Sequence, residues 1–255
     1  MQKPLPLIGS QFDSTYALMK KEWRQALPLL LVFGALQLIF TVGIRMMMPK
    51  PGVFTPTLIL PFSIYELVLI GLSVLLLRRL MKSTTPVGAK PLSLGLTMVY
   101  LIVSGIISVV ASGLAALLLI LPGIWLAITL SFAGFEIIEL GKSPIEALSS
   151  SYALVKGRWW ATFGRVCCAM AVVFGVDIVL GIFVGIFSVT LFLAFGSSVG
   201  TGATSPMILC IDVFNAVVII PVMLFMFSYQ ISLYRSLKET QNQTIDAAVS
   251  TNPVV

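Results

Sequence analysis

The sequence predicts an all-α integral membrane protein, a bundle of six transmembrane helices with two cytoplasmic amphipathic helices lying at the membrane interface. Of its 255 residues, 58% are hydrophobic and 10% are charged, whereas a soluble domain carries about 25% charged residues. Residues 91–135 form a single uncharged run, more than twice the roughly 20 residues that cross a bilayer. These features exclude a soluble enzyme, a disordered chain and a nucleic-acid-binding protein.

The absence of histidine and the small number of cysteines exclude several kinds of catalytic and metal-binding site. There is no histidine, which excludes His-ligated metal sites, haem with a histidine ligand and Ser-His-Asp catalysis. The cysteines are Cys167, Cys168 and Cys210, and their spacing fits neither a disulfide framework nor a CxxC metal pair. We therefore expect no catalytic site, no metal site and no cofactor. Polar and charged residues fill positions 9–25, so no cleavable signal peptide is expected.

Uncharged apolar runs bounded by charge, proline or glycine predict the spans. The six predicted spans are 26–44, 58–77, 94–119, 122–140, 166–190 and 207–233. The third and fourth share one uncharged run, which we divide at residues 121–124. Pro122 is expected to open a new helix there and Gly123 to permit the sharp turn. The predicted membrane domain covers 1–238, and residues 239–255 are expected to form a polar, disordered tail.

The basic residues predict the orientation of these spans. Of sixteen Lys and Arg residues, only Arg45 and Lys50 fall on the side opposite to all the others. Such asymmetry in short loops is the positive-inside signal, so we expect both termini in the cytoplasm. The predicted location is a bacterial inner membrane, which the chain crosses several times.

Two segments outside the spans show helical periodicity of apolar residues. The first carries Phe12, Tyr16, Met19 and Trp23, and the second carries Ile145, Leu148, Tyr152, Val155 and Trp159. Ser143 to Glu146 reads as a capping box with proline at the first helical position. We expect both segments to lie on the cytoplasmic leaflet, where aromatic residues sit at headgroup depth. The predicted interface anchors are Tyr16, Trp23, Tyr152, Trp159 and Trp160.

The same two segments resemble each other in sequence. Residues 14–23 and 150–159 are identical at six of ten positions in one register. One interpretation is a duplicated unit, an interfacial helix plus a hairpin of spans, with halves that start near residues 11 and 144. The other is convergence, because any amphipathic helix next to a membrane favours Tyr, Lys and Trp. We favour duplication.

A stretch around the fourth span resembles a known family. It reads Leu121-Pro122-Gly123-Ile124-Trp125, then Gly141-Lys142-Ser143-Pro144 and Glu146-Ala147-Leu148, with Ser151 following. This pattern resembles the YciC-like bacterial inner-membrane family and the related membrane domain of some glycerophosphoryl diester phosphodiesterases. The match is closest over residues 120–160. It implies a multispanning inner-membrane protein, and it carries no catalytic function to this chain.

Polar residues inside the predicted spans are the candidate functional residues. They are Glu66, Asp177, Asp212 and Asn215. An acid at the centre of a bilayer costs about 2.5–3.5 kcal/mol on insertion scales, so it is rarely without a role. Glu66 and Asp177 either belong to a proton- or cation-linked path or are protonated and bonded to neighbours such as Ser63, Tyr65 or Asn215. Glu136 and Glu139, near Lys142, are expected to form a solvated cluster at headgroup level.

These features predict a non-enzymatic membrane protein with a structural, scaffold or lipid- and envelope-associated role. Its expected partners are the lipid bilayer and its anionic headgroups, a second copy of the chain or another membrane protein, and not nucleic acid. The alternative is a small secondary transporter or channel that uses the intramembrane carboxylates for proton or cation coupling.

Overall fold

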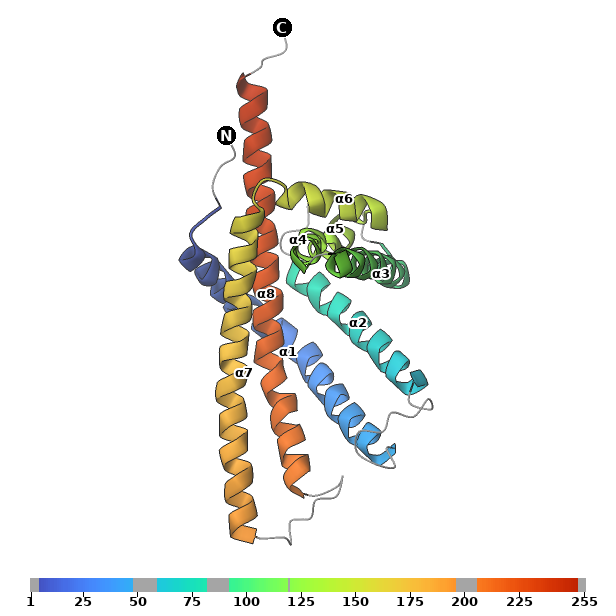
Figure 1. Cartoon of the computed structure of the whole chain (residues 1–255), viewed down its shortest axis with the longest axis vertical. Coiled ribbons are helices and arrows are strands. Elements are labelled where there is room, and N and C mark those ends of the chain that lie inside the picture. The colour runs from blue at the N-terminus through green and yellow to red at the C-terminus, as the bar shows by residue number, and fades with distance from the viewer. Residues whose placement is uncertain (1–4, 48–58, 82–91, 119, 196–205, 252–255) are drawn as a thin grey trace. The chain divides into compact units, whose positions relative to one another are not determined.

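The structure is a computed structural model that describes residues 5–47, 59–81, 92–118, 120–195 and 206–251. Within these ranges every regular element is an α-helix (Figure 1). The helices are α1 (Ile8–Met47), α2 (Ile59–Met81), α3 (Leu94–Leu118), α4 (Ile120–Leu130), α5 (Ala133–Leu140), α6 (Pro144–Val155), α7 (Trp159–Phe195) and α8 (Pro206–Thr251). The all-α prediction is confirmed for this part of the chain.

Among the described residues, six stretches are long and apolar enough to cross a membrane, as the sequence predicts. They are Ile8–Ile44, Leu60–Met81, Leu94–Leu117, Ile120–Leu140, Trp159–Phe187 and Leu209–Ile245. Their ends differ from the predicted ones. The segment expected as a separate interfacial helix before the first span is continuous with that span in α1. At the other end, α8 extends to Thr251, so residues 239–251 are helical and not a disordered tail.

The chain divides into two compact units. The first unit contains Met1–Glu22, Val74–Cys168 and Phe227–Val255, and the second contains Trp23–Ser73 and Ala169–Met226. Helices α3 to α6 therefore belong wholly to the first unit, whereas α1, α2, α7 and α8 each contribute to both.

Close packing joins α3 to α4 in the first unit. A Cβ atom added to Gly123 would lie 2.5 Å from the Cβ of Ala116, far closer than two carbon atoms can approach. Gly123 is helical and does not adopt the left-handed conformation of a turn. Its role thus differs from the predicted one, because the missing side chain allows two helices to touch and does not shape the connection between them.

The predicted fourth span is broken into α4 and α5 at Ser131 and Phe132. Ser151 of α6 stabilises the break. Its hydroxyl donates to the backbone oxygen of Thr129 (2.6 Å) and accepts from the backbone N–H of Phe132 (3.2 Å). Ser151 is completely buried, so it partners backbone groups that the interrupted helix leaves without an internal bond.

Two glycines with positive φ lie on either side of the short helix α6, one at the end of α5 and one before α7. Gly141 closes α5 with φ 66°, and its N–H donates to the backbone oxygen of Ile137. Ser143 and Glu146 form the predicted capping box, with Pro144 in the first turn, so this prediction is confirmed. Gly157, with φ 81°, separates α6 from α7. In Figure 1, α6 lies beside α3, α4 and α5, against which it packs.

The beginning of α1 packs on the end of α8 within the first unit. The side-chain amide of Gln11 donates to the Ser232 hydroxyl (2.8 Å), and Ser236 donates to the amide oxygen of Gln11 (3.1 Å). The rings of Phe12 and Tyr229 lie 5.4 Å apart between their centroids. Gln11 is buried, and its amide is thus satisfied on both of its polar atoms.

Candidate functional site

Two glutamates of α5 form the centre of a buried polar cluster in the first unit. Glu136 and Glu139 are three residues apart, which places them on one face of the helix. Their exposed fractions are 3% and 6%. The structure therefore contradicts the expectation that this cluster is solvated. Burial is possible because each carboxylate has a lysine partner, whereas an unpaired buried charge is costly.

A tyrosine of α8 joins the two carboxylates. The hydroxyl of Tyr234 lies 2.8 Å from Oε1 of Glu136 and 2.6 Å from Oε2 of Glu139. Tyr234 is fully buried, and its ring stacks on Phe135 at a centroid distance of 5.4 Å. Since a phenol has one proton, it donates to one carboxylate at a time. The tyrosine is therefore a donor shared by two acids.

Two lysines neutralise the pair. Lys142, which follows α5, lies 2.5 Å from Oε2 of Glu136 and also donates to the Ser150 hydroxyl of α6. Lys238, one helical turn after Tyr234, pairs with Glu139. Two acids and two bases thus compensate each other across α5, α6 and α8. This arrangement is suited to holding three helices in register, since every charged group of the cluster is committed to a partner within it.

The sequence prediction missed Tyr234 as a site residue and counted Lys238 only as evidence for orientation. The spacing within each helix is visible in the sequence, three residues for the glutamates and four for Tyr234 and Lys238. The two pairs are separated by almost a hundred residues, and no local pattern shows that they meet.

The candidate intramembrane residues lie in the second unit and are not gathered into one site. Asp212 is buried, whereas Asn215, one turn later on α8, is exposed. Glu66 on α2 and Asp177 on α7 are also exposed on the surface of the chain. The suggested pairing of Tyr65 with an acid is not seen, because its hydroxyl donates to the side-chain oxygen of Gln37.

Glu66 lies at a pocket, and Asp177 does not belong to its lining. The pocket has a volume of about 510 Å³. Its lining comes from α1 and α2 and consists of Gln37, Phe40, Thr41, Ile44, Phe62, Tyr65, Glu66 and Leu69. Within the described ranges no basic side chain lines it. The arrangement can therefore receive a group with positive charge and apolar surface.

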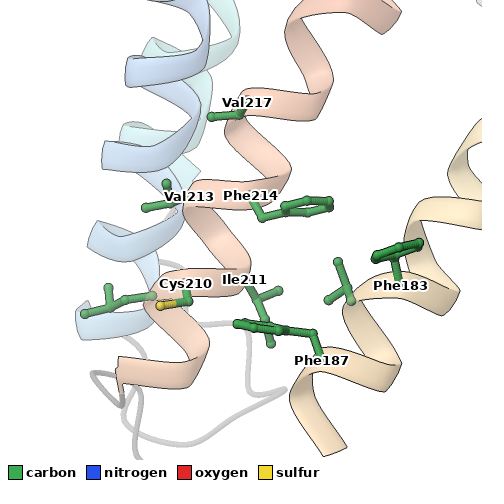
Figure 2. Close-up of a pocket in the computed structure, with 9 residues that line it drawn as sticks. Phe183, Phe187, Cys210, Ile211, Val213, Phe214 and Val217 are labelled. Carbon is green, nitrogen blue, oxygen red and sulfur yellow. The ribbon is translucent and has the colours of Figure 1, made fainter. Parts of the chain in front are cut away.

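A second pocket, of about 610 Å³, lies between α7 and α8 (Figure 2). Its lining is Phe183, Val184, Phe187, Leu209, Cys210, Ile211, Val213, Phe214 and Val217. In Figure 2, Phe187 extends towards α8 and Phe214 extends towards α7. Because the lining is apolar throughout, this pocket can accept hydrocarbon, such as a lipid chain, but offers no group that could recognise a charge.

Most of the predicted interface anchors are exposed. Tyr16 is 67% exposed and Trp160 is 76% exposed, and Trp23 and Tyr152 are also exposed. Trp159 is half-buried, and its indole N–H donates to the backbone oxygen of Trp125 (3.2 Å).

The periodic apolar face of the second segment is exposed in part and buried in part. Ile145 is exposed, whereas Val155 is buried and Leu148 packs against the core formed by Ala133, Ile137 and Ala147. The amphipathic stripe of α6 therefore serves partly as a packing surface for this chain.

Among the residues that the structure describes, no group of three or more cysteine, aspartate or glutamate side chains is placed to hold a metal ion. The described residues do bring together the neutralised cluster around Tyr234 and the pocket lined by Glu66. No family model, curated protein or solved structure matches this chain.

Proposed function

We propose that the chain is a non-enzymatic, multi-pass protein of the bacterial inner membrane, with both termini in the cytoplasm. Its role is to organise the membrane by binding anionic lipid headgroups, and it belongs to the YciC-like family that it resembles over residues 120–160. One observation carries the lipid-binding role. In both repeated segments an exposed tyrosine is followed, four residues later, by an exposed lysine: Tyr16 with Lys20, and Tyr152 with Lys156.

The two segments share a pattern of burial as well as sequence. At the common offset of 136 residues, Gln11 corresponds to Ala147, Thr15 to Ser151 and Leu18 to Leu154. All six residues are buried. Each segment thus packs one face on its own neighbours and presents the tyrosine and lysine on the other, which supports duplication over convergence.

The exposed face combines the side chains that favour a membrane surface. The ammonium of Lys156 lies over the ring of Tyr152, 5.8 Å from its centroid. Exposed Lys21 adds a second cation to the first segment, and exposed Trp160 adds an aromatic ring after the second. A lysine near an anionic leaflet contributes about 1 kcal/mol, and tyrosine and tryptophan favour the headgroup region.

Quenching of tryptophan fluorescence by brominated lipids tests this proposal. The chain is reconstituted with brominated phosphatidylglycerol or brominated phosphatidylcholine, and the ratio of quenching reports the preference for anionic lipid. We expect a several-fold preference that disappears at about 1 M salt, where charge interactions extend only about 3 Å. The triple change Lys20→Gln, Lys21→Gln, Lys156→Gln should abolish the preference.

The matched control replaces the same three lysines by arginine, which keeps the charge and should keep the preference. Equal quenching by both lipids in the wild-type chain, or equal loss in the glutamine and arginine variants, would contradict the proposal.

The orientation is tested by cysteine labelling in a chain whose three native cysteines are replaced by alanine. A membrane-impermeant maleimide added to intact cells should label Lys50→Cys and leave Lys156→Cys unlabelled until the cells are opened. Labelling of Lys156→Cys from outside would reverse the topology and remove the cytoplasmic leaflet as the partner.

Cation- or proton-coupled transport is the second candidate, and the pocket at Glu66 is the observation that favours it. A path through both intramembrane acids has less support, since Asp177 lies outside the lining of this pocket. Proton flux in proteoliposomes distinguishes the candidates, because a carboxylate-coupled transporter loses flux on Glu66→Gln while it stays folded.

A further inference from the structure

The pocket at Glu66 combines a carboxylate with a cluster of aromatic rings. Phe40 of α1 stacks on Tyr65 of α2, with ring centroids 3.6 Å apart and planes 3° from parallel. The ring centroids of Phe62 and Phe40 lie 5.7 Å apart, and the two ring planes are tilted by 56°. All three rings line the pocket beside Glu66. Aromatic faces attract cations at such sites, most strongly those that are poorly hydrated.

The two hydroxyl groups of the lining already have partners. The Tyr65 hydroxyl donates to the side-chain oxygen of Gln37, and the Thr41 hydroxyl donates to the backbone oxygen of the same residue (2.8 Å). In the described part of the chain, no lysine or arginine lines the pocket beside Glu66. The carboxylate is therefore the charged group that the lining offers to a ligand, in a stretch of helix that is otherwise uncharged.

We propose that this pocket binds an organic ammonium ion with apolar substituents. The charge of Glu66 selects a cation, the three rings add cation–π attraction, and Ile44 and Leu69 provide apolar contact. A divalent metal ion is a poor fit because it needs several oxygen ligands and the pocket offers one carboxylate. This inference depends on the pocket alone and is independent of the lysines proposed to bind anionic lipid.

Organic ammonium can come from a soluble amine or from the ethanolamine headgroup of a lipid. The test uses the full-length chain in neutral maltoside micelles, with tritiated tetrabutylammonium as the probe. We expect saturable binding. Added phosphatidylethanolamine, but not phosphatidylglycerol, should displace the probe if the lipid headgroup is the natural occupant. Absence of displacement assigns the pocket to a soluble amine.

Two carboxylate variants decide whether Glu66 is the binding group. Glu66→Gln should weaken probe binding at least tenfold, equivalent to about 1.4 kcal/mol. Asp177→Asn removes an equal charge from the same unit outside the pocket and should change binding less than twofold. Phe62→Leu, which removes one ring, should weaken it several-fold. Equal losses in the two carboxylate variants, or no saturable binding to the wild-type chain, would overturn the proposal.

A second measurement needs no variant and covers the case in which Glu66→Gln fails to fold. Dicyclohexylcarbodiimide modifies carboxyl groups in apolar surroundings, and peptide mass spectrometry locates the adduct. Tetrabutylammonium should slow modification of Glu66 in the wild-type chain and leave modification of Asp177 unchanged. Equal rates at Glu66 with and without the probe would count against the assignment.

Discussion

Replacing Tyr234 by phenylalanine tests whether the shared hydroxyl stabilises the buried glutamate pair. The change removes one oxygen atom from a side chain that is fully buried, and it keeps the ring that stacks on Phe135. A hydrogen bond to a charged group contributes about 1.5–3 kcal/mol. The phenol donates one proton to the two carboxylates, so one hydrogen bond to a charged group is lost, together with the longer contact (3.3 Å) in which the hydroxyl accepts from Lys238. We therefore expect the free energy of unfolding to fall by about 2 kcal/mol.

Tyr229 supplies a control on the same helix. It is also almost completely buried, but its hydroxyl donates to a neutral acceptor, the backbone oxygen of Arg165 (2.9 Å). Tyr229→Phe should cost about 1 kcal/mol, the usual value for a neutral hydrogen bond. Both variants remove the same atom from the same type of residue, so their difference measures the contribution of the charged partners of Tyr234, which are the two carboxylates and Lys238.

The assay is equilibrium unfolding in mixed micelles, in which the fraction of dodecyl sulfate is raised and loss of helix is followed by circular dichroism. Size-exclusion chromatography first confirms that each variant is folded and monodisperse. If Tyr229→Phe costs as much as Tyr234→Phe or more, the two carboxylates do not depend on the hydroxyl, and the interpretation of the cluster as a shared-donor site is wrong.

Four further substitutions test local geometry by the same unfolding assay. Gly123→Ala should destabilise the chain by more than 1 kcal/mol because the added Cβ would overlap Ala116. Gly181→Ala should stabilise the chain by about 0.5–1 kcal/mol, because a Cβ at this position meets nothing within 4 Å and alanine favours the helix more than glycine does. Ser151→Ala should cost about 1–3 kcal/mol, since it leaves buried backbone groups at the α4–α5 break unpaired. Gly157→Ala should cost about 1–2 kcal/mol because alanine resists the left-handed backbone there. An unchanged free energy of unfolding in any of these variants would contradict the local packing, hydrogen bond or backbone conformation on which its prediction rests.

The six helices of the described residues that are long and apolar enough to cross a membrane could be predicted from sequence, because they depend on the length of apolar runs. The ends of the spans could not. Residues 14–23 and 150–159 are alike, but Gly157 interrupts the second helix where Lys21 occupies the aligned position of the first. Lysine is a good helix former and glycine is not, so α1 continues where the corresponding segment stops. The higher helix propensity of lysine at this position could be read from the sequence. The similarity of the two segments nevertheless suggested that both helices end at the same aligned position.

The break between α4 and α5 depends on a distant residue. Ser131 and Phe132 include neither proline nor glycine, so no local signal predicts an interruption there. It becomes stable because Ser151, some twenty residues later, is positioned by α6 to bond the freed backbone groups. Such a feature follows from packing between elements, which a pattern within one element does not contain.

The surroundings of the candidate residues also depend on packing between helices and could not be predicted from local patterns. A charge within an apolar run identified Glu66, and the pocket beside it arises from the way Gln37 and Phe40 of α1 meet α2. Glu136 and Glu139 were judged from their place at the end of a span, where water is expected to reach. Their burial results from α8 covering them, which the position of Tyr234 in the sequence does not reveal.

The dependence of α5 on α8 has a consequence for biosynthesis. Lys238 is 99 residues after Glu139 in the chain, so the carboxylate is made well before its partner. At a synthesis rate of about 5–20 residues per second, this delay is roughly 5–20 s. During that interval the nascent protein carries an acid whose counter-ion does not yet exist, and water or a chaperone must accommodate it. A transcript truncated before codon 234 would leave this intermediate as the final product, with Glu139 lacking both Tyr234 and Lys238.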